Sequence, residues 1–200
     1  MMASFLRSVS TALCAITLVG LSGCAKAGDT RFYVLTPLPA AERPSNPGRA
    51  PLVGLLPVDL PEQLDRPQIV TRVGPNRLQL AEFDQWAAPL RESFMRVLAE
   101  NLSILIPADR VALFPWSKDT PIDYEVAVEV VRFEGALGGD CSLVANWTIA
   151  RRGGREAAAT GRSSHSEPAG ESYASLVSAE SRLIAALGRD IAAALKAIPR

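Results

Sequence analysis

The chain has 200 residues with 21 basic and 21 acidic side chains, so its formal net charge at neutral pH is zero. This balance produces no global positive field and argues against nucleic acid as a partner. Hydrophobic residues make up 48% of the chain, which is ordinary for a globular protein and excludes extensive disorder.

The N-terminal segment has the features of a secretory signal. One cation, Arg7, precedes an apolar run over residues 12–21, which is shorter than the roughly 20 residues that a transmembrane helix requires. The run ends in Leu21-Ser22-Gly23-Cys24, a pattern that resembles a bacterial lipobox, in which the cysteine is acylated and becomes the first mature residue. We therefore expect residues 1–23 to be a lipoprotein signal peptide and Cys24 to be the lipidation site, carrying covalent acyl chains such as palmitate.

The alternative is a plain signal peptide that is cut near Ala25 or Ala27, with Cys24 incidental. Two or three acyl chains on Cys24 would anchor the protein stably, because each buried methylene group contributes about 0.8 kcal/mol. Ala25 stands where an aspartate commonly retains a lipoprotein in the inner membrane, so we expect the outer membrane. Lys26 keeps the inner membrane as the alternative.

Residues 24–31 are expected to form a lipidated tether in front of one periplasmic α+β domain, residues 32–200. The eight steps from Cys24 to Phe32 span at most about 26 Å at about 3.3 Å per residue. Once residues 1–23 are removed, 177 residues with 20 cations and 21 anions remain, enough for a single domain with a sizeable core. The short tether favours a docking role near the membrane over shuttling through the periplasm.

Hydrophobic periodicity predicts both strands and helices in this domain. Alternating apolar residues and short apolar runs between prolines or glycines indicate strands, and apolar residues at steps of three and four indicate helices. Strands are predicted at residues 32–35, 52–60, 69–73, 77–80, 111–114, 124–131, 141–149 and 156–166, and helices at 83–105 and 172–196. These elements predict an α+β fold, a mainly antiparallel twisted sheet with two long helices packed on one face.

Two of these elements carry further expectations. Asp84 would lie near the N-terminus of the first helix, where the helix dipole favours a carboxylate. Pro89 must then fall within the first turn, or the helix starts near Ala88 and Trp86 belongs to the loop before it. The strand at 156–166 is rich in alanine, glycine and serine and is a candidate edge strand.

The sequence offers few residues for catalysis. Cys141 is the only cysteine left in the mature domain, which allows no intramolecular disulfide; its apolar strand predicts a small buried side chain, with a reactive thiol as the alternative. His165, the single histidine, is expected at the surface or at a strand edge. No Cys-x-x-Cys, His-Glu-x-x-His or Gly-x-Ser-x-Gly pattern occurs. We therefore expect no enzyme, no metal site and no cofactor other than the acyl chains.

A longer pattern runs through the whole domain. Its densest part is Val58-Asp59-Leu60-Pro61-Glu62-Gln63-Leu64-Asp65-Arg66-Pro67-Gln68-Ile69-Val70-Thr71-Arg72, in which Leu-Asp-Arg-Pro-Gln-Ile-Val is the specific signal. The flanking segments are residues 32–35, 86–90, 99–102, 114–116 and 132–134 and the alanine-rich C-terminal helix. Together they resemble the ABC-type transport auxiliary lipoprotein family, the PqiC (YmbA-like) component of paraquat-inducible, MCE-type lipid transport systems.

The resemblance implies an outer-membrane lipoprotein that faces the periplasm. Its partner would be a PqiB-like MCE-domain protein of the inner membrane, which forms a tube for lipids. The lipoprotein would dock the distal end of this tube at the outer membrane as a homo-oligomeric ring and support membrane integrity. The implied role is binding and positioning.

The candidate partner interface consists of Leu64, Asp65, Arg66 and Gln68. These residues lie in a proline-bounded connection between strands, where binding residues concentrate. The alternative is that Asp65 and Arg66 form a local ion pair that shapes the turn.

Two functions of other classes remain open. A monomeric lipid-carrier lipoprotein would hold an acyl chain between the helices and the sheet. An envelope enzyme would have to show turnover of an ester or glycan substrate that survives Ser-to-Ala changes near Ser163.

Overall fold

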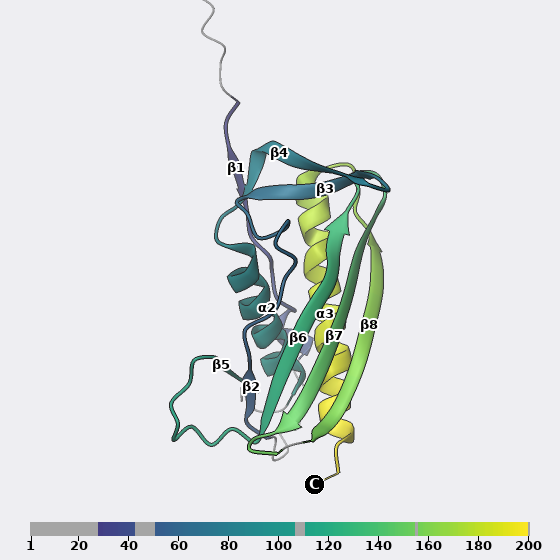
Figure 1. Ribbon diagram of the computed structural model, residues 1–200. Coiled ribbons are helices and arrows are strands. Elements are labelled where there is room, and N and C mark those ends of the chain that lie inside the picture. The colour runs from purple at the N-terminus through teal and green to yellow at the C-terminus, as the bar shows by residue number, and fades with distance from the viewer. Residues whose placement is uncertain (1–27, 43–50, 107–110, 155, 200) are drawn as a thin grey trace, which may run out of the picture.

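The computed structural model describes residues 28–42, 51–106, 111–154 and 156–199. In these ranges, one mixed sheet of eight strands carries two long helices on a single face (Figure 1). The α+β class, the largely antiparallel pairing of the long strands and the placement of both helices on one face are confirmed.

The elements are longer or shorter than the sequence pattern indicates, but nearly all of them are present. In chain order they are β1 (Arg31–Tyr33), the 3-10 turn η1 (Ala40–Glu42), β2 (Val53–Leu55), β3 (Gln68–Gly74), β4 (Arg77–Trp86), α2 (Leu90–Leu105), β5 (Val111–Leu113), β6 (Tyr124–Gly135), β7 (Asp140–Arg151), β8 (Ala157–Pro168) and α3 (Tyr173–Ala197). The predicted signal peptide, residues 1–23, and the lipidation site Cys24 lie outside the described residues.

Strand β6 is the centre of the sheet. One of its edges pairs antiparallel with β7, which in turn pairs antiparallel with β8. The other edge pairs in parallel with β2 near its start and with β3 at its end, where Thr71 lies opposite Gly135. β4 follows β3 as an antiparallel hairpin, and β1 and β5 add parallel to β4 and β2.

The alternation in β6 explains how the sheet presents its apolar side to the helices. Tyr124, Val126, Val128 and Val130 are buried at every second position, as the sequence predicts. A bulge between Val130 and Arg132 shifts the alternation by one residue, so Phe133 is buried next. The ring of Phe133 meets Phe94 of α2 edge to face, with centroids 5.1 Å apart.

The helices cover the sheet with continuous apolar stripes. α3 buries Leu176, Leu183, Ile184, Leu187 and Ile191 completely, and its N-terminus is closed by a capping box between Ser172 and Ser175. Fully buried side chains therefore fill the space between helices and sheet.

The first helix begins later than its apolar spacing predicts. Residues 83–86 belong to β4, and the helix starts at Leu90 with Pro89 at its N-cap. Proline disfavours the helical conformation of the residue before it, so the strand runs to Trp86 and the helix begins after Pro89. The helical start at residue 83 and the helix-dipole role of Asp84 are therefore wrong, and the start near Ala88 is close to the observed one.

The edge position of β8 is confirmed. It pairs with β7 alone, and its glycine has a packing role. Gly161 lies opposite Trp147, and a Cβ at this position would stand 2.1 Å from the indole ring. The ring can lie flat against the strand only because residue 161 has no side chain.

Candidate functional site

The connection between β2 and β3 is folded into a tight turn by its own backbone. The Leu64 amide donates to the Pro61 carbonyl at 2.9 Å, and the Arg66 amide donates to the Leu64 carbonyl at 2.9 Å. The side chain of Leu64 is only 3% exposed and belongs to the hydrophobic core. Leu64 therefore fixes the connection to the core, and the solvent-accessible part of the candidate interface consists of Asp65, which is exposed, and of Arg66 and Gln68, which are half-buried.

Arg91, in the first turn of α2, ties this connection to the helix. Its Nε donates to Asp65 Oδ2 at 3.0 Å, and its two terminal nitrogens donate to the carbonyls of Val58 at 3.0 Å and Leu60 at 3.2 Å. Asp59 adds an ion pair at 3.7 Å. One guanidinium thus holds three acceptors on a segment that lies about thirty residues before it, and the sequence alone gave no sign of this.

The local ion pair between Asp65 and Arg66 is not formed. Asp65 is bound by Arg91, and no carboxylate within residues 28–42, 51–106, 111–154 and 156–199 lies within ion-pair distance of Arg66. The Nε of Arg66 is buried and has no hydrogen-bond partner in the described part of the chain. The turn is therefore shaped by Arg91, and among the described residues no carboxylate pairs with the charge of Arg66.

Arg66 lies at a surface pocket with a volume of about 320 Å³. We call it the Arg66 pocket; its lining residues are Asp65, Arg66, Pro67, Trp86, Ala88 and Pro89. It forms where the end of the connection meets the end of β4, because the Trp86 amide donates to the Pro67 carbonyl at 2.7 Å. Gln68, which opens β3, pairs with Gln85 beside this pocket and is half-buried.

A buried carboxylate in β4 fastens the first strand to the domain. Asp84 receives hydrogen bonds from Arg31 Nε at 2.8 Å, Arg31 Nη2 at 2.7 Å and the Tyr33 hydroxyl at 2.6 Å. Burial raises the pKa of the Asp84 carboxyl, but the hydrogen bonds from Arg31 and Tyr33 outweigh burial and hold this pKa below its ordinary value. This contact lies where the predicted tether enters the domain.

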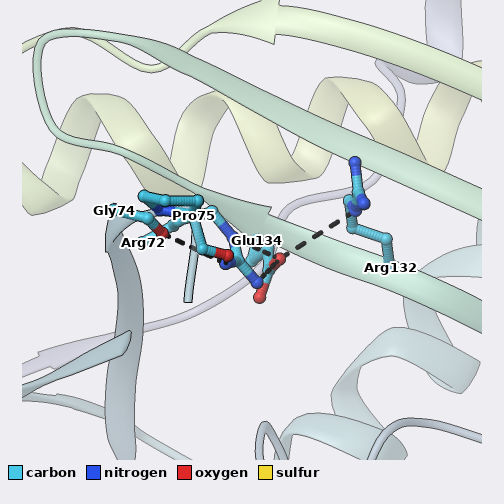
Figure 2. Close-up of polar contacts among 5 residues, drawn as sticks. All are labelled: Arg72, Gly74, Pro75, Arg132 and Glu134. Carbon is cyan, nitrogen blue, oxygen red and sulfur yellow. Dashed lines mark hydrogen bonds and ion pairs between the residues drawn. The ribbon is translucent and has the colours of Figure 1, made fainter. Parts of the chain in front are cut away.

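A second ion-pair cluster holds the β3–β4 hairpin against β6 (Figure 2). Glu134, near the end of β6, is buried, and Arg72 Nε donates to its Oε1 at 2.7 Å. Arg72 also donates to the carbonyls of Gly74 and Pro75, and Arg132 lies 4.0 Å from the same carboxylate oxygen. Figure 2 shows the two arginines approaching Glu134 from opposite sides. The cluster fixes the shape of the hairpin.

The single histidine joins a polar cluster between β8 and α3. His165 Nε2 lies 2.7 Å from Asp190 Oδ2, and the Ser163 hydroxyl donates to the same oxygen at 2.6 Å. In a nucleophilic triad the histidine stands between the serine and the carboxylate, whereas here the carboxylate stands between the other two. Ser163 is only 2% exposed and also accepts from the Trp147 indole at 3.1 Å. Its geometry is that of a buried structural contact.

Cys141 of β7 and Glu180 of α3 are both buried. Cys141 is completely buried, as predicted, and burial raises the pKa of its thiol far above the ordinary value, which is the opposite of an activated nucleophile. Glu180 is 2% exposed, its Oε2 has no hydrogen-bond partner within the described ranges, and burial raises the pKa of its carboxyl to about 8. In the part of the chain that the structure describes, no group of three or more histidine, cysteine, aspartate or glutamate residues is arranged to hold a metal. None of the described helices is long and apolar enough to span a membrane.

Comparison with known families gives one match. A family model described as "ABC-type transport auxiliary lipoprotein component" matches residues 33–192. No curated protein matches the chain.

Solved structures share the fold at low sequence identity. A crystal structure of an uncharacterized protein superposes with a TM-score of 0.68 at 20% identity and covers 83% of this chain and 98% of its own. Protein XCC0632 from Xanthomonas campestris has a TM-score of 0.64 at 17% identity and covers 82% of this chain and 93% of its own. A PelC dodecamer from Paraburkholderia phytofirmans reaches a TM-score of 0.46 at 11% identity, over 78% of this chain and 93% of its own.

Proposed function

Because this chain belongs to the ABC-type transport auxiliary lipoprotein component family, we propose that it is the outer-membrane lipoprotein of an MCE-type lipid transport system. In this role it docks the distal end of a PqiB-like MCE tube, which the inner membrane holds, and so supports the integrity of the envelope. The observation that carries the proposal is the extent of the family match, since residues 33–192 include almost the whole domain.

The N-terminal part supplies the anchor in this proposal. Residues 1–23 act as the signal peptide, Cys24 carries the acyl chains, and residues 24–31 connect the bilayer to the domain. Arg31 already belongs to β1, so the seven steps from Cys24 to Arg31 span at most about 23 Å. The bonds from Arg31 and Tyr33 to Asp84 support this assignment, because they fix the end of the tether to the sheet.

The docking surface in this proposal is the solvent-accessible part of the connection, at the exposed Asp65 and the half-buried Arg66 and Gln68. Arg91 holds the connection from the side of α2, and the start of β3 holds it from the other side. A surface whose backbone is already fixed loses little conformational entropy on binding, which favours recognition of a partner. Several copies arranged in a ring would each contribute one such contact to the tube, and their effects would combine through avidity.

The test is capture of the full-length lipoprotein from gently solubilised envelopes, followed by mass spectrometry of what co-purifies. An MCE-domain protein as the main partner supports the proposal, and native mass spectrometry of the complex counts the copies of the lipoprotein. Recovery of the lipoprotein alone, with bound phospholipid, contradicts docking and supports the monomeric carrier.

A charge reversal locates the docking surface. Arg66→Glu is expected to reduce the amount of captured MCE protein without unfolding the domain, as checked by circular dichroism. The matched control is Arg77→Glu, which changes an exposed arginine in the β3–β4 hairpin. Unchanged capture by a folded Arg66→Glu protein would exclude this surface.

A further inference from the structure

The Arg66 pocket combines rigid apolar walls with one available cation. Trp86, Pro67, Pro89 and Ala88 form the apolar part of the lining. The two prolines have no amide hydrogen, and the Trp86 amide is already bonded to the Pro67 carbonyl. The guanidinium of Arg66 is therefore the strong donor at this pocket.

The charge of Arg66 is not neutralised by the acidic residue beside it. Asp65 also lines the pocket, but its carboxylate is bound by Arg91 at 3.0 Å. Arg66 Nε is buried and finds no hydrogen-bond partner among the residues that the structure describes, which is a costly state for a charged group. Because this atom is buried, a ligand in the pocket meets the accessible part of the Arg66 side chain, where an anionic acceptor forms a stronger bond than a neutral one.

We infer that the Arg66 pocket binds an acidic, apolar peptide segment of the docking partner, in which a carboxylate pairs with Arg66 and a neighbouring apolar side chain packs on Trp86. The inference deepens the proposed docking function and rests on it for the nature of the partner. Walls of tryptophan and proline favour a peptide, because rigid aromatic and proline surfaces receive side chains with little loss of entropy. The volume of about 320 Å³ is at the small end of ligand sites and suits one side chain with its carboxylate.

The test follows the indole signals of the full-length protein, purified in detergent and labelled with ¹⁵N-tryptophan. The chain has three tryptophans, so Trp86, which lines the pocket, reports on binding, and Trp116 and Trp147 report on the rest of the fold. The probes are N-acetyl-leucine, which carries a carboxylate next to an apolar side chain, its amide N-acetyl-leucinamide, and inorganic phosphate.

The expected result is a saturable shift of the Trp86 signal with N-acetyl-leucine. The dissociation constant of the amide should be at least about tenfold higher, because the amide cannot form the hydrogen bond between charged groups. Arg66→Gln abolishes the shift, Arg66→Lys retains part of it, and the Trp116 and Trp147 signals stay in place in both variants. Equal binding of the acid and the amide would overturn the inference. A shift of Trp86 by phosphate that is as large as the one by N-acetyl-leucine would also overturn it, because the pocket would then be a phosphate or headgroup site.

The inference and the proposed function fail separately. Carboxylate binding at Trp86 in a protein that captures no MCE protein would support the pocket and contradict the MCE system. If the protein captures the MCE protein but its Trp86 signal does not shift with N-acetyl-leucine, the proposed function is supported and the inference is overturned.

Discussion

Arg91 Nε lies 3.0 Å from Asp65 Oδ2, and through this contact helix α2 sets the shape of the connection that carries Arg66. The same guanidinium donates to the carbonyls of Val58 and Leu60, so three acceptors on one segment share one donor group. The connection therefore has a defined conformation before any partner binds, and Arg66 is placed at its pocket with the help of Arg91, which does not line the pocket.

Arg91→Ala is expected to loosen this connection. The loss of three hydrogen bonds from a charged guanidinium, one to a carboxylate and two to backbone carbonyls, at a partly exposed site should lower the free energy of unfolding by about 1–2 kcal/mol. Hydrogen exchange of the amides in residues 58–66 should become faster, while the amides of β6 and β7 stay protected. The control is Arg96→Ala, which removes an exposed arginine from the same helix. Unchanged exchange in the connection would show that Arg91 does not hold it.

The contact between Arg31 and Asp84 should control the attachment of β1. Arg31→Ala removes two of the three hydrogen bonds to a buried carboxylate, so the amides of β1 should exchange faster by roughly an order of magnitude. Because the pKa of Asp84 lies below its ordinary value, the contact stabilises the domain above about pH 4 and is lost as the pH falls below it. The difference in exchange between the two proteins should therefore shrink at acidic pH. Equal exchange at pH 6 would contradict this account, and Arg77→Ala is the control.

Glu180 should make the stability of the domain depend on pH. Burial raises its pKa from 4.5 to about 8, so the folded state holds a proton that the unfolded state has released. The free energy of unfolding should therefore fall as the pH rises from about 4.5 to 8, with a slope of up to about 1.4 kcal/mol per pH unit from this group. Urea unfolding of the wild type and of Glu180→Gln isolates the effect, because other groups cancel in the difference. Parallel stability curves over this range would refute it.

Gly161→Ala should destabilise the edge of the sheet. The new Cβ would stand 2.1 Å from the Trp147 indole, so either the ring or β8 must move. Overpacking of this kind costs about 1–3 kcal/mol. Gly74→Ala is the matched control, since its Cβ would have its nearest neighbour at 3.9 Å and its φ is not positive; its effect should be within about 0.5 kcal/mol. Equal urea midpoints for the two variants would mean that the indole accommodates the methyl group.

The sequence predicts the parts of the fold that depend on local patterns. The alternation from Tyr124 to Val130 identified β6, and the apolar stripe of the C-terminal helix identified α3 within one residue at each end. The pattern failed at Phe83 and Trp86, because their spacing to Leu90 is that of a helix, whereas residues 84–86 pair with β1 and continue the strand. That pairing joins residues about fifty positions apart, which no local pattern reveals.

The same limit applies to the candidate site. The sequence identified the proline-bounded segment with Asp65 and Arg66. Because these two opposite charges are adjacent in the chain, an ion pair between them was the alternative to a binding role. In the structure Asp65 accepts a hydrogen bond from Arg91, 26 residues away, and Arg66 lies at a pocket whose lining includes Trp86 and Pro89. The sequence could identify the segment and could not assign its partners, because those are brought together only by packing of α2 and β4.

The most direct test of the docking account is site-specific photocrosslinking in intact cells. A photoreactive residue replaces Gln63, which is exposed in the same connection as Arg66, and in a second protein it replaces Arg162, which is exposed on the edge strand β8. The account predicts that an MCE-domain protein is crosslinked from position 63 and that position 162 gives little or none of this product. Absence of an MCE product from position 63, with both proteins folded and expressed at equal levels, would contradict it.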